Sequence, residues 1–188
     1  NGEIVSDYDD FGPLFNRIGM NFMPVDYRGY GRSTGRPSIT SMLRDCHFIL
    51  EFARSWLKEN NYSGPVILMG RSLGSASVLE LASSYRDSIA GLIVESGFAR
   101  TDHLLRRLGM DPSEIAFSEA RGLQNLEKIG LYCGPTLVIH AEQDHILPFH
   151  NGQELYDACG SKDKTFLSIP SANHNDIFLK GLREYMEA

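Results

Sequence analysis

The residues best suited to chemistry are those of the pentapeptide Gly70-Arg71-Ser72-Leu73-Gly74. The apolar run at 65–69 before it predicts a buried parallel strand, and the apolar spacing at 75–85 after it predicts a helix. A serine on so sharp a strand-to-helix turn is held in a strained backbone with its hydroxyl projecting from the sheet. Gly70 and Gly74 would remove Cβ atoms that clash in the turn. The pattern therefore predicts that Ser72 is a nucleophile.

The same turn supplies a main-chain donor beside the serine. The N–H of Leu73 lies at the start of the predicted helix, where the peptide dipoles favour negative charge. We therefore expect Leu73 to contribute to an oxyanion hole when Ser72 attacks a carbonyl group.

A serine hydroxyl needs a base that removes its proton, and that base needs an acid that orients it. After such a turn the partners follow in the order Ser, Asp or Glu, His, each in a loop that follows a strand. Asp144 follows the predicted strand 136–140, and His174 follows the predicted strand 165–169, just before the last helix. The hypothesis is a catalytic triad of Ser72, His174 and Asp144.

Other residues compete for these roles. Glu95 ends the preceding predicted strand and is an alternative acid, whereas Asp176 suits the N-terminus of the last helix. His140 also lies at a strand end, where we expect it to shape the turn that carries Asp144. For Arg71 an ion pair is expected rather than a substrate contact. The remaining histidines are expected to be surface or core residues: His47, His103, His145 and His150.

The elements that must position these residues alternate between strand-like and helix-like patterns, which predicts an α/β fold with a mostly parallel sheet flanked by helices. The predicted strands are 20–27, 65–69, 89–94, 136–140 and 165–169, and the predicted helices are 11–18, 42–59, 75–85, 152–158 and 176–186. Pro24 conflicts with the first strand because it lacks a ladder donor. Thr40 or Ser41 is expected to cap the long helix at 42–59.

The alternation breaks between about residues 98 and 133 into short mixed helices. This stretch follows a strand, on the side of a parallel sheet where ligands bind. It predicts a small helical lid in which Phe98, Leu104 and Leu108 contact the substrate. The alternative is a packed helical connection without substrate contact.

Composition narrows the class of protein. The 188 residues suit a single domain spanning 1–188, and 42% hydrophobic with 22% charged residues is typical of a globular protein. A net charge of −6 does not favour binding to nucleic acid, and no apolar run is long enough to span a membrane. The spacing of Cys46, Cys133 and Cys159 favours buried thiols in a reducing, cytoplasmic compartment over a disulfide framework or a metal site.

These residues resemble the α/β-hydrolase superfamily. Within it the chain is similar to single-domain serine hydrolases of the alpha/beta-hydrolase-domain type, the group that includes protein depalmitoylases. The motifs are Asp26-Tyr27-Arg28-Gly29-Tyr30-Gly31-Arg32-Ser33 with Gly35-Arg36-Pro37-Ser38, the pentapeptide around Ser72, and His174-Asn175-Asp176-Ile177.

The resemblance implies hydrolysis of a carboxylic ester, thioester or amide through an acyl-enzyme on Ser72, with no metal or organic cofactor. The substrate would be a small molecule or an acylated protein. Peptidase activity and a non-catalytic binding scaffold are the alternatives, because fold does not fix function.

Two departures from the family pattern stand out. The chain has His140-Ala141 where relatives tend to have His-Gly, and it opens at Asn1-Gly2-Glu3, where members of the fold have further N-terminal strands. We therefore expect the chain to be the larger C-terminal portion of a longer protein. The backbone N–H of Asn1 or Gly2 would then be the second oxyanion donor beside Leu73.

Overall fold

Two compact units make up the chain, Asn1–Ser63 and Gly64–Ala188. The computed structural model describes residues 3–107, 109 and 122–188. The residues that the sequence assigns to a triad all belong to the second unit, so this unit can be discussed by itself. The prediction of a single domain spanning 1–188 stays a prediction.

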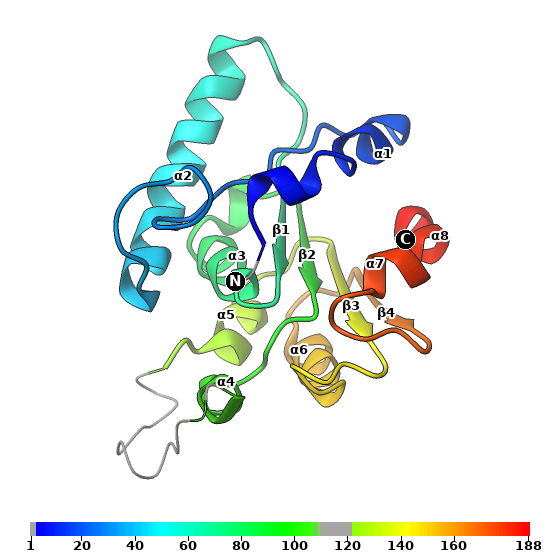
Figure 1. Cartoon of the computed structure of the whole chain (residues 1–188). Helices are drawn as coiled ribbons and strands as arrows, with labels where there is room; N and C mark the ends of the chain where they lie inside the picture. Colours follow the sequence, from blue (N-terminus) through cyan, green and yellow to red (C-terminus); the bar gives the residue numbers. More distant parts are fainter. Residues whose placement is uncertain (1–2, 108, 110–121) are drawn as a thin grey trace. The chain divides into compact units, whose positions relative to one another are not determined.

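The second unit is built on a four-stranded, wholly parallel sheet (Figure 1). Its strands are β1 (Ile67–Arg71), β2 (Gly91–Glu95), β3 (Thr136–Ala141) and β4 (Lys164–Ile169), and they lie side by side in chain order. Each was predicted from an apolar run of the sequence. Because all four strands point the same way, the loops that follow them begin at one edge of the sheet.

Helices complete this unit. α3 (Gly74–Ser84) packs on β1 and β2, α6 (His150–Ala158) packs on β3 and β4, and α5 (Asn125–Leu131) contacts both helices. The other helical segments are η2 (Arg86–Ser88), α4 (Thr101–Arg107), α7 (Ile177–Lys180) and α8 (Leu182–Glu187). These elements confirm the predicted α/β class.

The last helix, predicted as continuous over 176–186, is broken at Gly181 into α7 and α8. A Cβ atom at Gly181 would lie 2.6 Å from the Cδ1 atom of Ile169, the last residue of β4. The close approach of backbone to strand therefore requires glycine at this point, and the helix ends and restarts there.

The first unit contains η1 (Val5–Tyr8), α1 (Gly12–Arg17) and the long α2 (Ile39–Glu59). The predicted strand at 20–27 is wrong, because residues 3–63 contain no strand. An extended segment becomes a strand only when its backbone groups pair with a neighbour, and Pro24 offers no donor for such a ladder.

The N-cap of α2 is Ser38, not Thr40 or Ser41, so the helix begins three residues earlier than predicted. The Ser38 hydroxyl accepts from the N–H of Ser41 at 3.0 Å, and the Ser41 hydroxyl accepts from the N–H of Ser38 at 3.1 Å. This reciprocal arrangement satisfies two main-chain donors at once, which no cap at Thr40 or Ser41 could do.

The glycine-rich loop at 26–35 is organised by Asp26. Its carboxylate accepts from the N–H of Val5 at 2.8 Å and from the N–H of Arg32 at 3.1 Å, while its carbonyl accepts from the Ser33 hydroxyl at 2.7 Å. Gly31 has a φ of +51°, and a Cβ atom there would lie 2.0 Å from the Asp26 carboxylate. The Asp26 side chain therefore has a structural role in this loop, because it binds main-chain N–H groups.

An ion pair fastens this loop to α2. Arg28 donates from Nε and Nη2 to the two carboxylate oxygens of Asp45, at 2.7 and 2.9 Å. The hydrogen bond from Arg28 lowers the pKa of Asp45. Arg28 and Asp45 thus have structural partners in each other.

In the part of the chain that the structure describes, no helix combines the length and apolarity needed to cross a membrane. The predicted lid at 98–133 falls partly on residues 108 and 110–121, which lie outside the described residues. The lid therefore stays a prediction.

Candidate active site

Ser72 occupies a strained position directly after β1. Its φ is +52°, in the left-handed region that a residue with a Cβ atom rarely adopts. The Ser72 N–H donates to the carbonyl of Glu95 at 3.0 Å, and the Ser72 carbonyl accepts from both the N–H and the hydroxyl of Ser75. The backbone of Ser72 is thus held on both sides.

Only one of the two flanking glycines is needed for space. A Cβ atom at Gly70 would lie 2.5 Å from the Cγ2 atom of Val78, whereas a Cβ atom at Gly74 would meet nothing within 4 Å. The expectation that both glycines relieve a clash is therefore right for Gly70 and wrong for Gly74. Leu73, between Ser72 and α3, has an N–H with no acceptor among the described residues.

His174 lies between Ser72 and Asp144 and contacts both. Its Nε2 atom is 3.1 Å from the Ser72 hydroxyl oxygen, and its Nδ1 atom is 2.7 Å from the Oδ2 atom of Asp144. Because a carboxylate can only accept, Nδ1 carries the proton and Nε2 is left to accept from the Ser72 hydroxyl. Both His174 and Asp144 are buried. The three residues form a continuous hydrogen-bonded chain.

The loop after β3 holds the Asp144 carboxylate in place. Its other oxygen, Oδ1, accepts from the N–H of Ile146 at 2.9 Å and from the N–H of Leu147 at 2.8 Å. Burial raises the pKa of Asp144, but the hydrogen bonds from His174, Leu147 and Ile146 outweigh it, so the pKa lies below its ordinary value. Asp144 is therefore an ionised acceptor for the imidazole.

The second buried histidine near Asp144 is His140. Its Nε2 atom is 2.8 Å from the carbonyl of Leu147 and 3.6 Å from the Oδ2 atom of Asp144. Burial lowers the pKa of His140, which favours the neutral ring that donates to Leu147. His140 thus supports the turn that carries Asp144, in line with the expectation from sequence.

Glu95, the alternative acid, is engaged elsewhere. Its carboxylate accepts from Nε of Arg71 at 2.8 Å and from the hydroxyl of Tyr185. Arg71 also donates through Nη2 to the main-chain carbonyl of His174. Arg71 is therefore in an ion pair, as expected. The sequence reasoning missed Tyr185, although a single carboxylate at the end of an apolar strand signals a buried polar partner.

The comparison with protein families identifies the class. A family model described as serine aminopeptidase, S33, matches residues 1–126. The chain belongs to this family of α/β hydrolases. Its membership confirms the resemblance inferred from the motifs.

Relatives and solved structures agree with this family. The chain is 28% identical over 175 residues to protein bem46 of Schizosaccharomyces pombe, covering 88% of this chain and 56% of that protein. It is 29% identical over 194 residues to alpha/beta hydrolase domain-containing protein 17C of Mus musculus, covering 99% and 53%. The chain thus spans about half the length of these curated relatives.

A monoacylglycerol lipase from Paleococcus ferrophilus shares the fold of this chain. The match covers 99% of this chain and 88% of the lipase, with a TM-score of 0.73 and 22% sequence identity. At that identity the likeness concerns the fold alone.

The structure describes only some of the residues predicted to bind substrate or to supply the second oxyanion donor. Phe98 follows β2 and is fully buried, so its ring belongs to the core, and Leu104 is half-buried on α4. Leu108, Asn1 and Gly2 lie outside the described residues. The substrate contacts predicted for Phe98, Leu104 and Leu108 stay predictions. The same is true of the oxyanion role predicted for Asn1 or Gly2.

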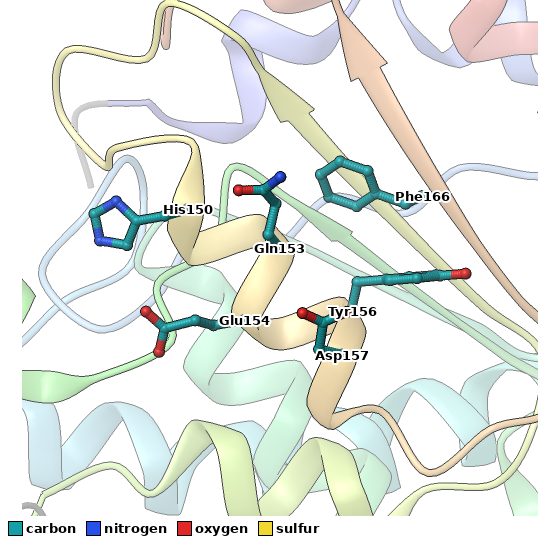
Figure 2. A pocket seen from close by; sticks show the side chains of 6 residues that line it. All are labelled: His150, Gln153, Glu154, Tyr156, Asp157 and Phe166. Carbon is teal, nitrogen blue, oxygen red and sulfur yellow. The ribbon is translucent and has the colours of Figure 1, made fainter.

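A surface hollow of about 410 Å³ lies on α6 and β4. Figure 2 shows the side chains that line it: His150, Gln153, Glu154, Tyr156, Asp157 and Phe166. It includes none of Ser72, His174 and Asp144, and no serine or cysteine nucleophile. The hydrogen-bonded chain of Ser72, His174 and Asp144 is therefore the better candidate for an active site than the hollow.

Within residues 3–107, 109 and 122–188, no cluster of His, Cys, Asp and Glu side chains is suited to hold a metal ion. Cys46, Cys133 and Cys159 form no disulfide bond with one another. Cys46 and Cys159 are buried, as predicted, whereas Cys133 is exposed, so the prediction of a buried thiol is wrong at Cys133.

Proposed function

We propose that this α/β hydrolase cleaves carboxylic ester or thioester bonds, with Ser72 as the nucleophile, His174 as the general base and acid, and Asp144 as the orienting acid. The observation that carries the proposal is the pair of contacts of His174, at 3.1 Å to Ser72 and 2.7 Å to Asp144. A nucleophile, a base and an orienting carboxylate in hydrogen-bonding reach form the arrangement that activates a serine.

In the acylation step the Ser72 Oγ atom bonds to the carbonyl carbon of the substrate, and the hydroxyl proton moves to Nε2 of His174. The carbonyl oxygen becomes an oxyanion. When the tetrahedral intermediate collapses, the bond to the leaving group breaks, and the alcohol or thiol leaves with the proton from His174. The product of this step is an acyl ester on Ser72.

In the deacylation step water replaces the alcohol or thiol. His174 accepts a proton from the water as its oxygen bonds to the acyl carbon, and then returns the proton to Ser72 as the carboxylic acid departs. Asp144 stays ionised throughout and stabilises the transient positive charge on the imidazole ring.

The oxyanion needs donors aimed at it. Leu73 is the first, since its N–H has no acceptor among the described residues and lies at the start of α3, where the helix dipole favours negative charge. We propose the N–H of Asn1 or Gly2 as the second donor.

The substrate class is proposed as an acylated small molecule or protein in the cytoplasm. Apolar side chains in the predicted lid, including Leu104 and Leu108, favour an acyl chain over a polar peptide. One structural neighbour is a monoacylglycerol lipase, which is in keeping with an acyl ester as substrate. The resemblance of the three motifs to the group that includes protein depalmitoylases favours a thioesterase as the form of this proposal.

A second candidate is peptidase activity, favoured by the description of the family as a serine aminopeptidase. The same three residues could cleave an amide. A non-catalytic scaffold is the third possibility, but such a module has no physical need to strain Ser72 and ionise Asp144 beside it.

The test is a panel of p-nitrophenyl esters and acyl thioesters of increasing chain length, with aminoacyl p-nitroanilides as the amide arm. We expect ester or thioester hydrolysis that falls by about 10⁴-fold or more in Ser72→Ala. Ser83→Ala is the matched control, because the Ser83 hydroxyl lies in α3 and, among the residues that the structure describes, donates only to the Glu80 carbonyl.

Two results would overturn the proposal. Cleavage of anilides alone would make the protein a peptidase. Equal ester turnover in the parent chain and in Ser72→Ala would remove Ser72 from the chemistry.

A further inference from the structure

A second set of hydrogen bonds reaches His174 from its main-chain side. The Nη2 atom of Arg71 donates to the His174 carbonyl, and Nε of the same guanidinium donates to Glu95 at 2.8 Å. The other carboxylate oxygen of Glu95 accepts from the hydroxyl of Tyr185 in α8. Three elements of the second unit, β1, β2 and α8, thus converge on the loop that carries the proposed base.

The same pair of residues also holds the nucleophile. Arg71 directly precedes Ser72 and is the register partner of Glu95 across β1 and β2. The Ser72 N–H donates to the carbonyl of Glu95. Glu95 therefore fixes the backbone of Ser72 through its main chain and, through its side chain and Arg71, the backbone of His174.

Stability alone does not account for this arrangement. The Glu95 side chain is 3% exposed and the Arg71 side chain 16% exposed, so both charges are largely removed from water. A buried ion pair of this kind adds little net stability, because the loss of hydration offsets the attraction between the charges. What it does supply is geometry, since Arg71 holds two acceptors in fixed directions.

We propose that Arg71 is a positioning residue for His174, oriented by Glu95 and Tyr185, and that it keeps the imidazole within reach of the Ser72 hydroxyl. The inference rests on the proposed function, in which His174 takes the proton of Ser72. Arg71 touches neither the proton nor the substrate; it acts through the backbone of the residue that does.

The experiment measures the labelling of the protein by a fluorophosphonate over time at several probe concentrations. The saturating rate constant reports how well His174 serves Ser72, and the amplitude reports the fraction of folded sites. For Arg71→Gln we expect a rate constant about 10- to 100-fold lower with the same probe affinity, as a shift of about 1 Å in the base would cause. Arg71→Lys, which keeps a charged donor, is expected to recover part of the rate.

A purely structural role would give a different result. It would lower the amplitude and the unfolding midpoint while each remaining site reacted at the parent rate. Arg183→Gln is the matched control, because Arg183 is an exposed arginine in α8 that pairs with Glu187. It is expected to change neither quantity.

Tyr185→Phe is the milder variant, for use if Arg71→Gln does not fold. It removes only the hydroxyl that orients Glu95 and keeps the ring that packs against Phe178. We expect a rate constant about 2- to 5-fold lower, the equivalent of one modest hydrogen bond.

The outcomes separate the two proposals. Parent protein that labels at Ser72, with unchanged rate constants per site in Arg71→Gln and Tyr185→Phe, overturns the positioning role and leaves the proposed function standing. A folded parent protein that does not label at all overturns both.

Discussion

Ser72 and Asp26 each lie in a glycine-containing turn, one in each unit of the chain, and both turns contain a residue with positive φ. In the glycine loop the positive φ values fall on glycines, Gly31 among them, which adopt them without strain, and the carboxylate of Asp26 accepts from two main-chain donors. In the serine turn the strained residue is Ser72 itself, and its backbone rather than its side chain holds the turn.

The difference shows how similar motifs come to serve structure or chemistry. Both carboxylate oxygens of Asp26 accept from main-chain N–H groups, so this side chain holds the loop. A side chain whose own backbone is satisfied by others, as at Ser72, is free to react. The proposed role of the Ser72 hydroxyl as nucleophile would account for a serine at a position where glycine would be unstrained.

The largest effect should follow from Ser72→Gly. Hydrolysis should fall by about 10⁴-fold or more because the nucleophile is lost, while the free energy of unfolding should stay equal or rise by up to about 1 kcal/mol because glycine accepts the positive φ. Ester turnover and urea denaturation measure the two quantities. A loss of more than about 2 kcal/mol would mean that the Ser72 side chain has a structural role like that of Asp26.

Asp144→Asn should lower hydrolysis by about 10³- to 10⁴-fold. An amide can present its NH₂ group to His174 and so favour the tautomer that cannot accept from Ser72. Turnover at saturating ester concentration checks this. Turnover close to that of the parent protein would return Glu95 to consideration as the acid.

Gly31→Ala should have the opposite effect to Ser72→Gly: it should lower stability rather than hydrolysis. The new Cβ atom would lie 2.0 Å from the Asp26 carboxylate at a positive φ, so we expect the first unit to lose about 1–3 kcal/mol of stability. The single tryptophan, Trp56 in α2, reports unfolding of this unit by fluorescence. The matched control is Gly12→Ala, because a Cβ atom at Gly12 meets nothing within 4 Å. Equal stability of the two variants would contradict the structural role of the loop.

The smallest effect concerns pH. Burial lowers the pKa of His140, so the unfolded chain binds a proton at this residue more readily than the folded one, and stability should fall as the pH drops below about 6.5. His140→Gln, which keeps a donor for the Leu147 carbonyl, should lose about 1 kcal/mol less than the parent protein between pH 7 and 5. Unfolding midpoints across this range provide the measurement, and parallel curves would rule out the titration of His140.

The depressed pKa of Asp144 acts at lower pH. Its contribution to stability is present above the unfolded pKa near about 3.9 and is lost as the pH falls through the lower folded value. The effect of Asp144 is therefore separate from the loss expected between pH 7 and 5.

Local patterns predicted the parts of the fold that local physics determines. Four apolar runs became the four parallel strands, and the order of Ser72, Asp144 and His174 behind strand ends brought together three residues that the structure places in hydrogen-bonding distance. These predictions needed only the length of an apolar run and the topology of a parallel sheet.

The features that were predicted wrongly or missed depend on residues that are distant in the sequence. The strand predicted at 20–27 depended on a ladder partner, and the break at Gly181 depended on the position of Ile169. Glu95 signals that a buried polar partner exists, but no local pattern identifies Tyr185 as that partner, because the contact joins residues 90 positions apart. Long-range polar contacts of this kind carry no periodicity that a sequence pattern could reveal.

The central claim is that His174 activates Ser72 for attack on an acyl group. It is tested most directly by fluorophosphonate labelling followed by peptide mapping. The account predicts one adduct on the peptide that contains Ser72, absent in Ser72→Ala and formed at least about 100-fold more slowly in His174→Ala. An adduct on another residue, or equal labelling rates in the folded parent protein and His174→Ala, would contradict it.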